Sequence, residues 1–302
     1  MSTDNKPDTK LQKLAEPFRF NDSNVTLRAG GVDFQIHKLV LSHASSIFKD
    51  MFSLPSDSSP SQEGSHVVEV TEDAQTIHDV LSLIYPNAHN IDLDDFHTLQ
   101  RVLLAARKYS MDNLRAILAK TLEAKIHVNP VGVFAVACLA EAPQVARIAA
   151  KETLKWSYTE IINCNSPEVN RMRGGTLRKL LHYHNVCADL ASQTIRKWAT
   201  QCPVDHHKNA YAKTSTSSPV DCRQSWWNSY IDCVERQSTT RPIQPDYKSI
   251  EFMRVLSEDT HCYSKCSTAT MRLIELADQL KQEVQQAISS VQLDLDDDDY
   301  LI

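Results

Sequence analysis

Glycine is scarce in this chain, with six residues in 302, against an average usage of about 7%. Phosphate-cradling loops need glycine for close backbone approach, and neither a P-loop nor a GxGxxG pattern occurs. A basic surplus is also lacking, because the formal net charge is −6, so counterion release does not favour binding to nucleic acid or to an anionic membrane. These absences argue against nucleotide chemistry by the common motifs and against charge-driven binding of nucleic acid.

Long apolar runs are absent as well. The first 20 residues are polar and no run of 18 apolar residues follows, so we expect neither a secretory signal nor a membrane span. The protein is therefore expected to be intracellular, in the cytoplasm or the nucleus. In that setting the eight cysteines are expected to be free thiols or metal ligands rather than a disulfide framework.

The first third of the chain alternates strand and helix patterns. Residues 1–20 show no periodicity and are expected to form a disordered tail. Alternating apolar residues on both sides of Gly30-Gly31 predict a β-hairpin over 25–36. The apolar positions of 39–52 predict short buried helices, and 67–70 predicts a third strand.

Helix caps and apolar stripes continue the pattern. Asp73 is expected to cap a helix that Pro86 ends, and Asp94 or Asp95 to cap the next. A further apolar stripe after Ser110 predicts that this second helix and its successor form a helical hairpin.

Three segments carry a family resemblance. The stretch DSNVTLRAGGVDFQIHKLVLSHASSIFKDMF, which contains His37, Lys38, Phe48, Met51 and Phe52, resembles the opening of the BTB/POZ family. VVEVTEDAQTIHDVLSLIYPN and RVLLAARKYSMDNLR resemble its later strand, helix and helical hairpin. The resemblance implies an α+β domain over 21–126, a small sheet covered by helices, that serves protein interaction. Asn24 departs from the Asp usual in the family, which bears on the charged pocket associated with its dimers.

The remaining chain is predicted to be mainly α-helical. We expect a helical region at 127–200, a Cys/His/Trp-containing segment with a long C-terminal helix at 201–293, and an acidic, solvated tail at 294–302. This part resembles a fungal lineage of BTB proteins, in which a His-rich helix and a Trp precede cysteine pairs and a double Trp.

Two cysteine and histidine clusters could hold zinc, which prefers four ligands supplied as two close pairs. Cys202 with His206 or His207 gives one pair, and Cys262 with Cys266 gives the other. A structural zinc would join this weakly patterned segment to the last helix. The alternative is that these residues are buried thiols and surface histidines.

Three other features have competing interpretations. His182 and His184 near Cys187 could suggest a nucleophile and base, but no nucleophile-elbow motif accompanies them, so packing on a helix face is preferred. Trp226-Trp227 could anchor a peptide, although core packing is favoured. The last helix could form a coiled-coil seam, although packing onto its own domain is favoured.

The sequence therefore predicts a non-enzymatic adaptor or scaffold that binds protein partners, a second copy of itself among them, through the BTB domain. No catalytic residue is assigned, and structural zinc is the one cofactor considered. The first alternative is a substrate adaptor of a cullin-type ubiquitin ligase, by analogy with other BTB proteins. The alternative of another class is a transcriptional regulator, which would need a basic zinc-finger array or a basic helix; neither occurs.

Overall fold

The computed structural model describes residues 13–54, 66–85, 91–200, 222–245, 247 and 267–295. The chain divides into two compact units, the first formed by Met1–Asn129 and Val136–Ala146 and the second by Pro130–Ala135 and Arg147–Ile302. Each is described by itself.

The first unit contains a three-stranded sheet with the order β2-β1-β3. Strands β1 (Val25–Ala29) and β2 (Val32–Ile36) form the predicted antiparallel hairpin, in which Val25 pairs with Ile36 and Ala29 with Val32. Strand β3 (His66–Val70) runs parallel to β1. Gly30 and Gly31 make the turn with φ of 52° and 78°, the left-handed values that a two-residue hairpin turn requires.

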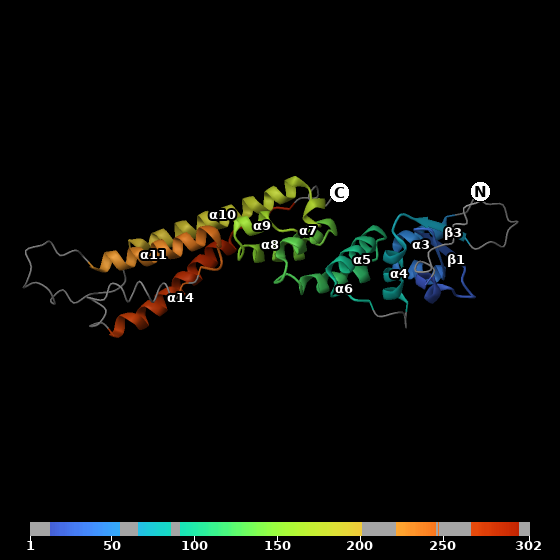
Figure 1. Cartoon of the computed structure of the whole chain (residues 1–302), viewed down its shortest axis with the longest axis horizontal. Helices are drawn as coiled ribbons and strands as arrows, with labels where there is room; N and C mark the ends of the chain where they lie inside the picture. The colour runs from blue at the N-terminus through green and yellow to red at the C-terminus, as the bar shows by residue number, and fades with distance from the viewer. Residues whose placement is uncertain are drawn as a thin grey trace, which may run out of the picture. The chain divides into compact units, whose positions relative to one another are not determined.

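Helices complete the first unit, as predicted (Figure 1). The two short helices are α2 (Lys38–Ala44) and α3 (Ser46–Ser53). Helix α4 (Ala74–Ile84) is capped by Asp73, which accepts a hydrogen bond from Thr76 N. Helix α5 (Phe96–Lys108) is capped by Asp95 and forms the helical hairpin with α6 (Asp112–Glu123). Large buried side chains of this unit form its core: Leu27, Phe34, Ile36, Leu41, Phe48, Ile77, Leu81, Leu99 and Leu103.

The N-terminal boundary differs from the predicted one. Residues before Asp22 belong to the fold, since the short 3-10 helix η1 (Glu16–Phe18) ends on a Phe18 that is 1% exposed. The Phe18 ring lies 6.1 Å from Phe34 and 5.8 Å from Tyr85, measured between centroids. A disordered tail extending to residue 20 is therefore wrong, because contacts with residues distant in sequence hold Phe18 in place.

The predicted helical character of 127–200 is confirmed. Its elements are α7 (Pro130–Leu139), α8 (Pro143–Thr153), α9 (Tyr158–Ile162), the 3-10 helix η2 (Val169–Arg171) and α10 (Gly174–Ala199). The division between the two units falls within α7 and again within α8.

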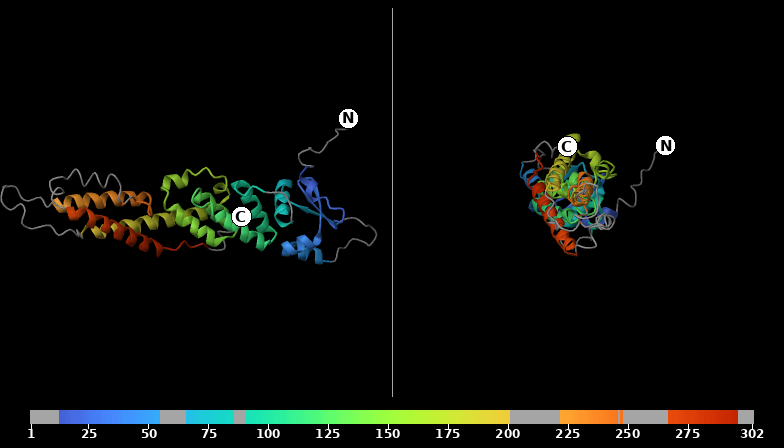
Figure 2. Two further views of the ribbon diagram at one scale, coloured as in Figure 1. Left: turned by 90° about the horizontal axis from the view of Figure 1, so that it is seen from below. Right: turned by 90° about the vertical axis from the view of Figure 1, so that its left-hand side faces the viewer.

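Three long helices dominate the second unit: α10, α11 (Cys222–Thr240) and α14 (Ser267–Ser289). Both α11 and α14 lie alongside α10 (Figures 1 and 2). Helix α14 is the predicted long C-terminal helix, and burial of Ala277, Leu280 and Val284 shows that its apolar stripe packs within its own unit.

Two features of the second unit were not predicted. Helix α11 lies where the sequence pattern weakens, and it buries Trp227, Tyr230, Ile231 and Val234 at helical spacing. After α14, Leu293 and Leu295 are both 8% exposed. The prediction of a solvated tail from residue 294 is therefore wrong at Leu295, whereas Asp294 is exposed.

Candidate protein-interaction site

Exposed apolar side chains gather on α2 and α3. Ten large apolar side chains are exposed in the described part of the chain, and four of them fall between residues 39 and 54. We call these four the α2–α3 surface: Leu39 (78% exposed), Ile47 (38%), Met51 (37%) and Leu54 (71%). Single exposed apolar residues are ordinary on a protein surface, but a concentration of them marks an interaction surface.

The buried side of α3 explains why the opposite side faces outward. Ser45 caps α3 by accepting a hydrogen bond from Phe48 N at 3.1 Å, and its hydroxyl donates to the carbonyl oxygen of Tyr109 at 2.5 Å. The Phe48 ring stacks on Tyr109 with centroids 4.8 Å apart. Phe48 is 1% exposed, whereas Ile47 and Met51, which are four residues apart and share a face, are each more than one third exposed.

The beginning of α2 is fixed to the sheet by side chains. Asn24 Oδ1 accepts a hydrogen bond from Lys38 N at 2.7 Å, which satisfies a backbone donor at the helix start. The Tyr85 hydroxyl accepts from His37 N at 2.9 Å. Asn24, which departs from the family pattern, thus fixes the start of α2. Leu39, the residue after Lys38, is thereby held in its exposed position.

His37 contributes a polar contact to the same corner. Its Nε2 lies 3.1 Å from Asp22 Oδ1, and this hydrogen bond holds the pKa of the Asp22 carboxyl below its usual range. The His37 side chain is 24% exposed. The ring is therefore only partly buried, between the end of β2 and the start of α2.

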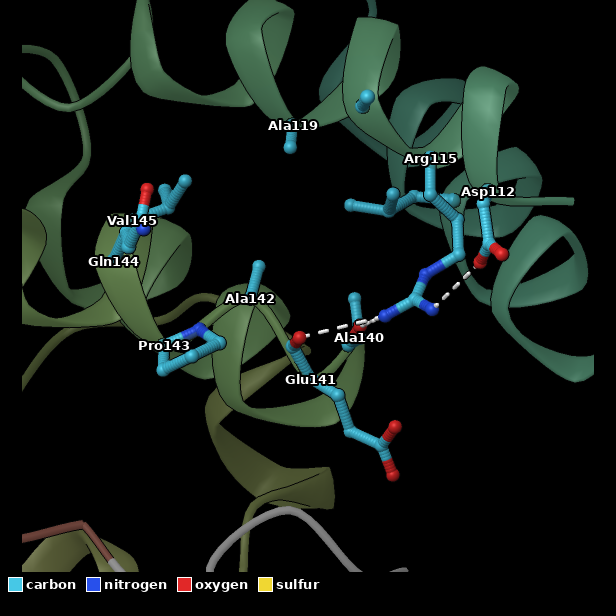
Figure 3. A pocket seen from close by; sticks show the side chains of 11 residues that line it. Asp112, Arg115, Ala119, Ala140, Glu141, Ala142, Pro143, Gln144 and Val145 are labelled. Carbon is cyan, nitrogen blue, oxygen red and sulfur yellow. Dashed lines mark hydrogen bonds and ion pairs between the residues drawn. The ribbon is translucent and has the colours of Figure 1, made fainter. Parts of the chain in front are cut away.

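A pocket of about 320 Å³ lies in the first unit (Figure 3). Its apolar lining is made largely of small side chains, Ala116, Ala119, Ala140, Ala142 and Pro143. Figure 3 shows Ala119 of α6 across an open space from Ala142 and Pro143, with Arg115 at its edge. A pocket with this lining can accept an apolar side chain of modest size.

Two arginines hold the wall of this pocket. Arg115 donates to the carbonyl oxygen of Ala140 at 3.2 Å, and Arg107 donates to that of Leu139 at 2.5 Å and to the Glu141 carboxylate at 2.6 Å. Glu141 has a φ of 53°, the left-handed conformation common just after a helix end. The guanidinium groups satisfy carbonyl groups at the end of α7, so the pocket is preformed.

The predicted zinc ligands Cys202, His206, His207, Cys262 and Cys266 all lie outside the described residues. Within the ranges that the structure describes, no three His, Cys, Asp or Glu side chains are grouped as a metal site would require. The zinc site stays a prediction from spacing.

The His182, His184 and Cys187 group is arranged for packing. His184 is buried and donates from Nε2 to the carbonyl oxygen of Trp156 at 2.9 Å, and burial lowers its pKa. Burial raises the pKa of the Cys187 thiol to about 11, and its hydrogen-bond partner is Tyr183. His182 is exposed. A thiol that stays protonated at neutral pH is a poor nucleophile, so the packing interpretation is supported.

Trp227 is fully buried, as the core-packing interpretation of the Trp pair predicts. Its indole nitrogen donates to the carbonyl oxygen of Trp198 at 2.8 Å, and its ring centroid lies 5.5 Å from that of Tyr230. It is therefore unavailable as a peptide anchor. Nothing is described of the Trp226 side chain.

A small sheet with helices around it, and with exposed apolar side chains on its first two helices, defines a protein-interaction domain. Residues 15–126 match the family model of the BTB/POZ domain. This part of the chain is a BTB/POZ domain, which is a protein-interaction module and not a catalytic one. None of the described helices is both long enough and apolar enough to cross a membrane.

Proposed function

We propose that this protein is a non-enzymatic adaptor that self-associates through the α2–α3 surface of its BTB domain and presents its helical unit to other proteins. The observation that carries the proposal is the exposure of four large apolar residues on and directly after two consecutive helices, namely Leu39, Ile47, Met51 and Leu54. A second copy offers the same surface, so two apolar faces can bury one another about a twofold axis.

The energetics favour burial of this surface. Removing apolar area from water is worth about 25 cal/mol per Å², and Leu39 alone leaves most of its side chain in solvent. The polar contacts that fix the helix starts, Asn24 with Lys38 and Ser45 with Phe48, keep the surface in one conformation. A preorganised surface loses little conformational entropy on association.

Co-purification of two differently tagged copies tests the proposal. We expect wild-type copies to capture one another. Leu39→Asp combined with Met51→Asp should reduce capture at least tenfold, because the contact would then bury two unpaired charges from each copy. Ile117→Asp is the matched control, since Ile117 is an apolar residue of the same domain with 61% exposure. Failure of wild-type copies to capture one another, or an equal loss with the control, would contradict self-association.

The second candidate function is that of a cullin ubiquitin-ligase adaptor, and the pocket beside Arg115 favours it. Its small side chains leave space for an apolar side chain of another protein. Ala119→Trp would fill that space. The candidate predicts that a purified cullin N-terminal domain binds the wild-type chain and that Ala119→Trp weakens binding at least tenfold; lack of binding by the wild-type chain would exclude it.

A further inference from the structure

The start of α10 carries a concentrated positive charge. Residues 171–182 read RMRGGTLRKLLH and contain no acidic residue. The α10 basic surface consists of Arg171, Arg173, Arg178, Lys179 and His182; Lys179 is half-buried and the other four are exposed. Neither Arg171 nor Arg178 forms an ion pair with any residue that the structure describes.

Positive charge lies at both ends of α10, but at its far end Arg196 is already paired with Glu235. Arg178 and His182 are four residues apart and share one face, on which the next exposed charged residue is Asp189. The positive end of the α10 dipole lies at the same place as the arginines. An anionic segment that approaches the first half of this face is therefore attracted by the arginines at the beginning of α10 and repelled by Asp189.

The end of the described chain runs toward this surface. The Trp198 indole donates to Glu283 at 2.7 Å, which places the last third of α14 beside the end of α10. Figures 1 and 2 show that α14 runs antiparallel to α10, so the chain beyond it heads for the start of α10. Leu293 and Leu295 are buried and Asp294 between them is exposed, so the chain stays packed on the unit as far as Leu295.

Chain geometry gives the reach of the residues that follow. From Trp198 back to Arg178 the axis of α10 covers about 30 Å, at about 1.5 Å per residue. From Glu283 to Val291 the chain covers about 12 Å, because Ser290 and Val291 still bond back to the last turn of the helix. The four residues from Val291 to Leu295 add at most about 13 Å. Leu295 can therefore come within about 5 Å of the level of Arg178, and the next four residues can extend about 13 Å further.

Those four residues are Asp296–Asp299. We propose that they dock in cis on the α10 basic surface, so that the acidic tail covers it. The docked tail neutralises a cationic face that would otherwise attract acidic segments of other proteins. While the tail covers the α10 basic surface, the helical unit can bind only partners that do not use that surface.

Zero-length carbodiimide cross-linking of the full chain at low ionic strength tests the contact. The reagent joins a carboxylate to an amine only when the two touch, and Lys179 is the amine within the basic surface. We expect peptide mapping to find an amide between Lys179 and one of Asp296–Asp299. A mixture of ¹⁴N- and ¹⁵N-labelled protein should give no mixed-isotope link. Since screening shortens the Debye length to about 3 Å at 1 M salt, the yield should fall steeply there.

Matched variants make the test specific. Arg171→Gln with Arg178→Gln should lower the yield of the link at least fivefold, because two charges that attract the tail are gone. Arg236→Gln, an exposed arginine on α11, should leave it unchanged. The proposal is overturned if the tail aspartates link only to other lysines, link only between chains, or give no link while their peptides are detected.

Discussion

The indole nitrogen of Trp198 donates a 2.7 Å hydrogen bond to a carboxylate oxygen of Glu283, which joins α10 to α14. The carbonyl oxygen of Trp198 accepts from the Trp227 indole at 2.8 Å. One residue near the end of α10 thus contacts both of the helices that lie alongside it. In the BTB unit the hydroxyl of Ser45 plays a comparable part, since it caps α3 and donates to the carbonyl oxygen of Tyr109.

Replacing Trp198 by Phe should destabilise the helical unit. The change removes the donor to Glu283, and a hydrogen bond to a charged partner is worth about 1.5–3 kcal/mol; because Glu283 is exposed, we expect about 1–2 kcal/mol. Replacing the indole by a phenyl ring also removes side-chain volume. A double-mutant cycle with Glu283→Gln, measured by urea unfolding, separates the free energy of the hydrogen bond from that of the lost volume. A coupling energy near zero would show that the contact contributes nothing.

Asp79 should make the BTB domain sensitive to acid. It is 4% exposed, and burial alone would raise the pKa of its carboxyl, but hydrogen bonds from His78 and Gln75 and the charge of Arg101 outweigh burial and lower it. The pKa of a carboxyl such as Asp79 is about 4 in the unfolded chain. Because the pKa is lower in the folded state, the Asp79 carboxylate stabilises the fold above about pH 4, and this stability is lost as the pH falls through the folded-state pKa.

Asp79→Asn should therefore flatten the fall in stability below about pH 4. Asp50→Asn removes the same charge at an exposed position of α3 and serves as the control. Denaturant midpoints at several pH values measure the effect. If both variants follow the same pH profile as the wild type, Asp79 has no such role.

Cys187 should resist alkylation in the folded protein. Burial raises the pKa of its thiol to about 11, so at pH 8 the reactive thiolate is scarce. Peptide mapping after iodoacetamide treatment should show Cys187 labelled only after unfolding, and the partly exposed Cys164 should be labelled first. Rapid labelling of native Cys187 would revive the nucleophile interpretation.

The zinc prediction rests on Cys202, His206 or His207, Cys262 and Cys266. If these ligands share an ion, metal analysis should find about one zinc per chain, held at about 2.0–2.3 Å per ligand. Cys262→Ser should lose the metal and loosen residues 200–266 while leaving the BTB domain intact. A chain that purifies without metal, and whose stability a chelator leaves unchanged, would make these cysteines ordinary thiols.

Local signals account for what the sequence predicted correctly. The Gly30-Gly31 turn and the caps at Asp73 and Asp95 act within a few residues of their partners, so the hairpin and helices α4 and α5 could be predicted. Helix α11 was missed although Trp227, Tyr230, Ile231 and Val234 have helical spacing. Polar residues dominate its other positions, and its burial depends on packing against α10.

The candidate site was predictable only in part. Phe18 is held by Phe34 and Tyr85, which are distant in sequence, so no local pattern could show that it belongs to the domain. The exposure of Leu39 and Met51 could not be predicted from the sequence either. The apolar pattern of 39–52 predicts burial of most of these residues, and only the packing of Phe48 on Tyr109 decides which side of α3 faces solvent.

Absolute molar mass by light scattering tests the central claim, self-association through the BTB domain, most directly. The chain has a mass of 34.1 kDa. At concentrations well above micromolar we predict twice that mass for the wild type, and the single-chain mass for Leu39→Asp combined with Met51→Asp. A wild-type protein that elutes at the single-chain mass across this concentration range would contradict the account.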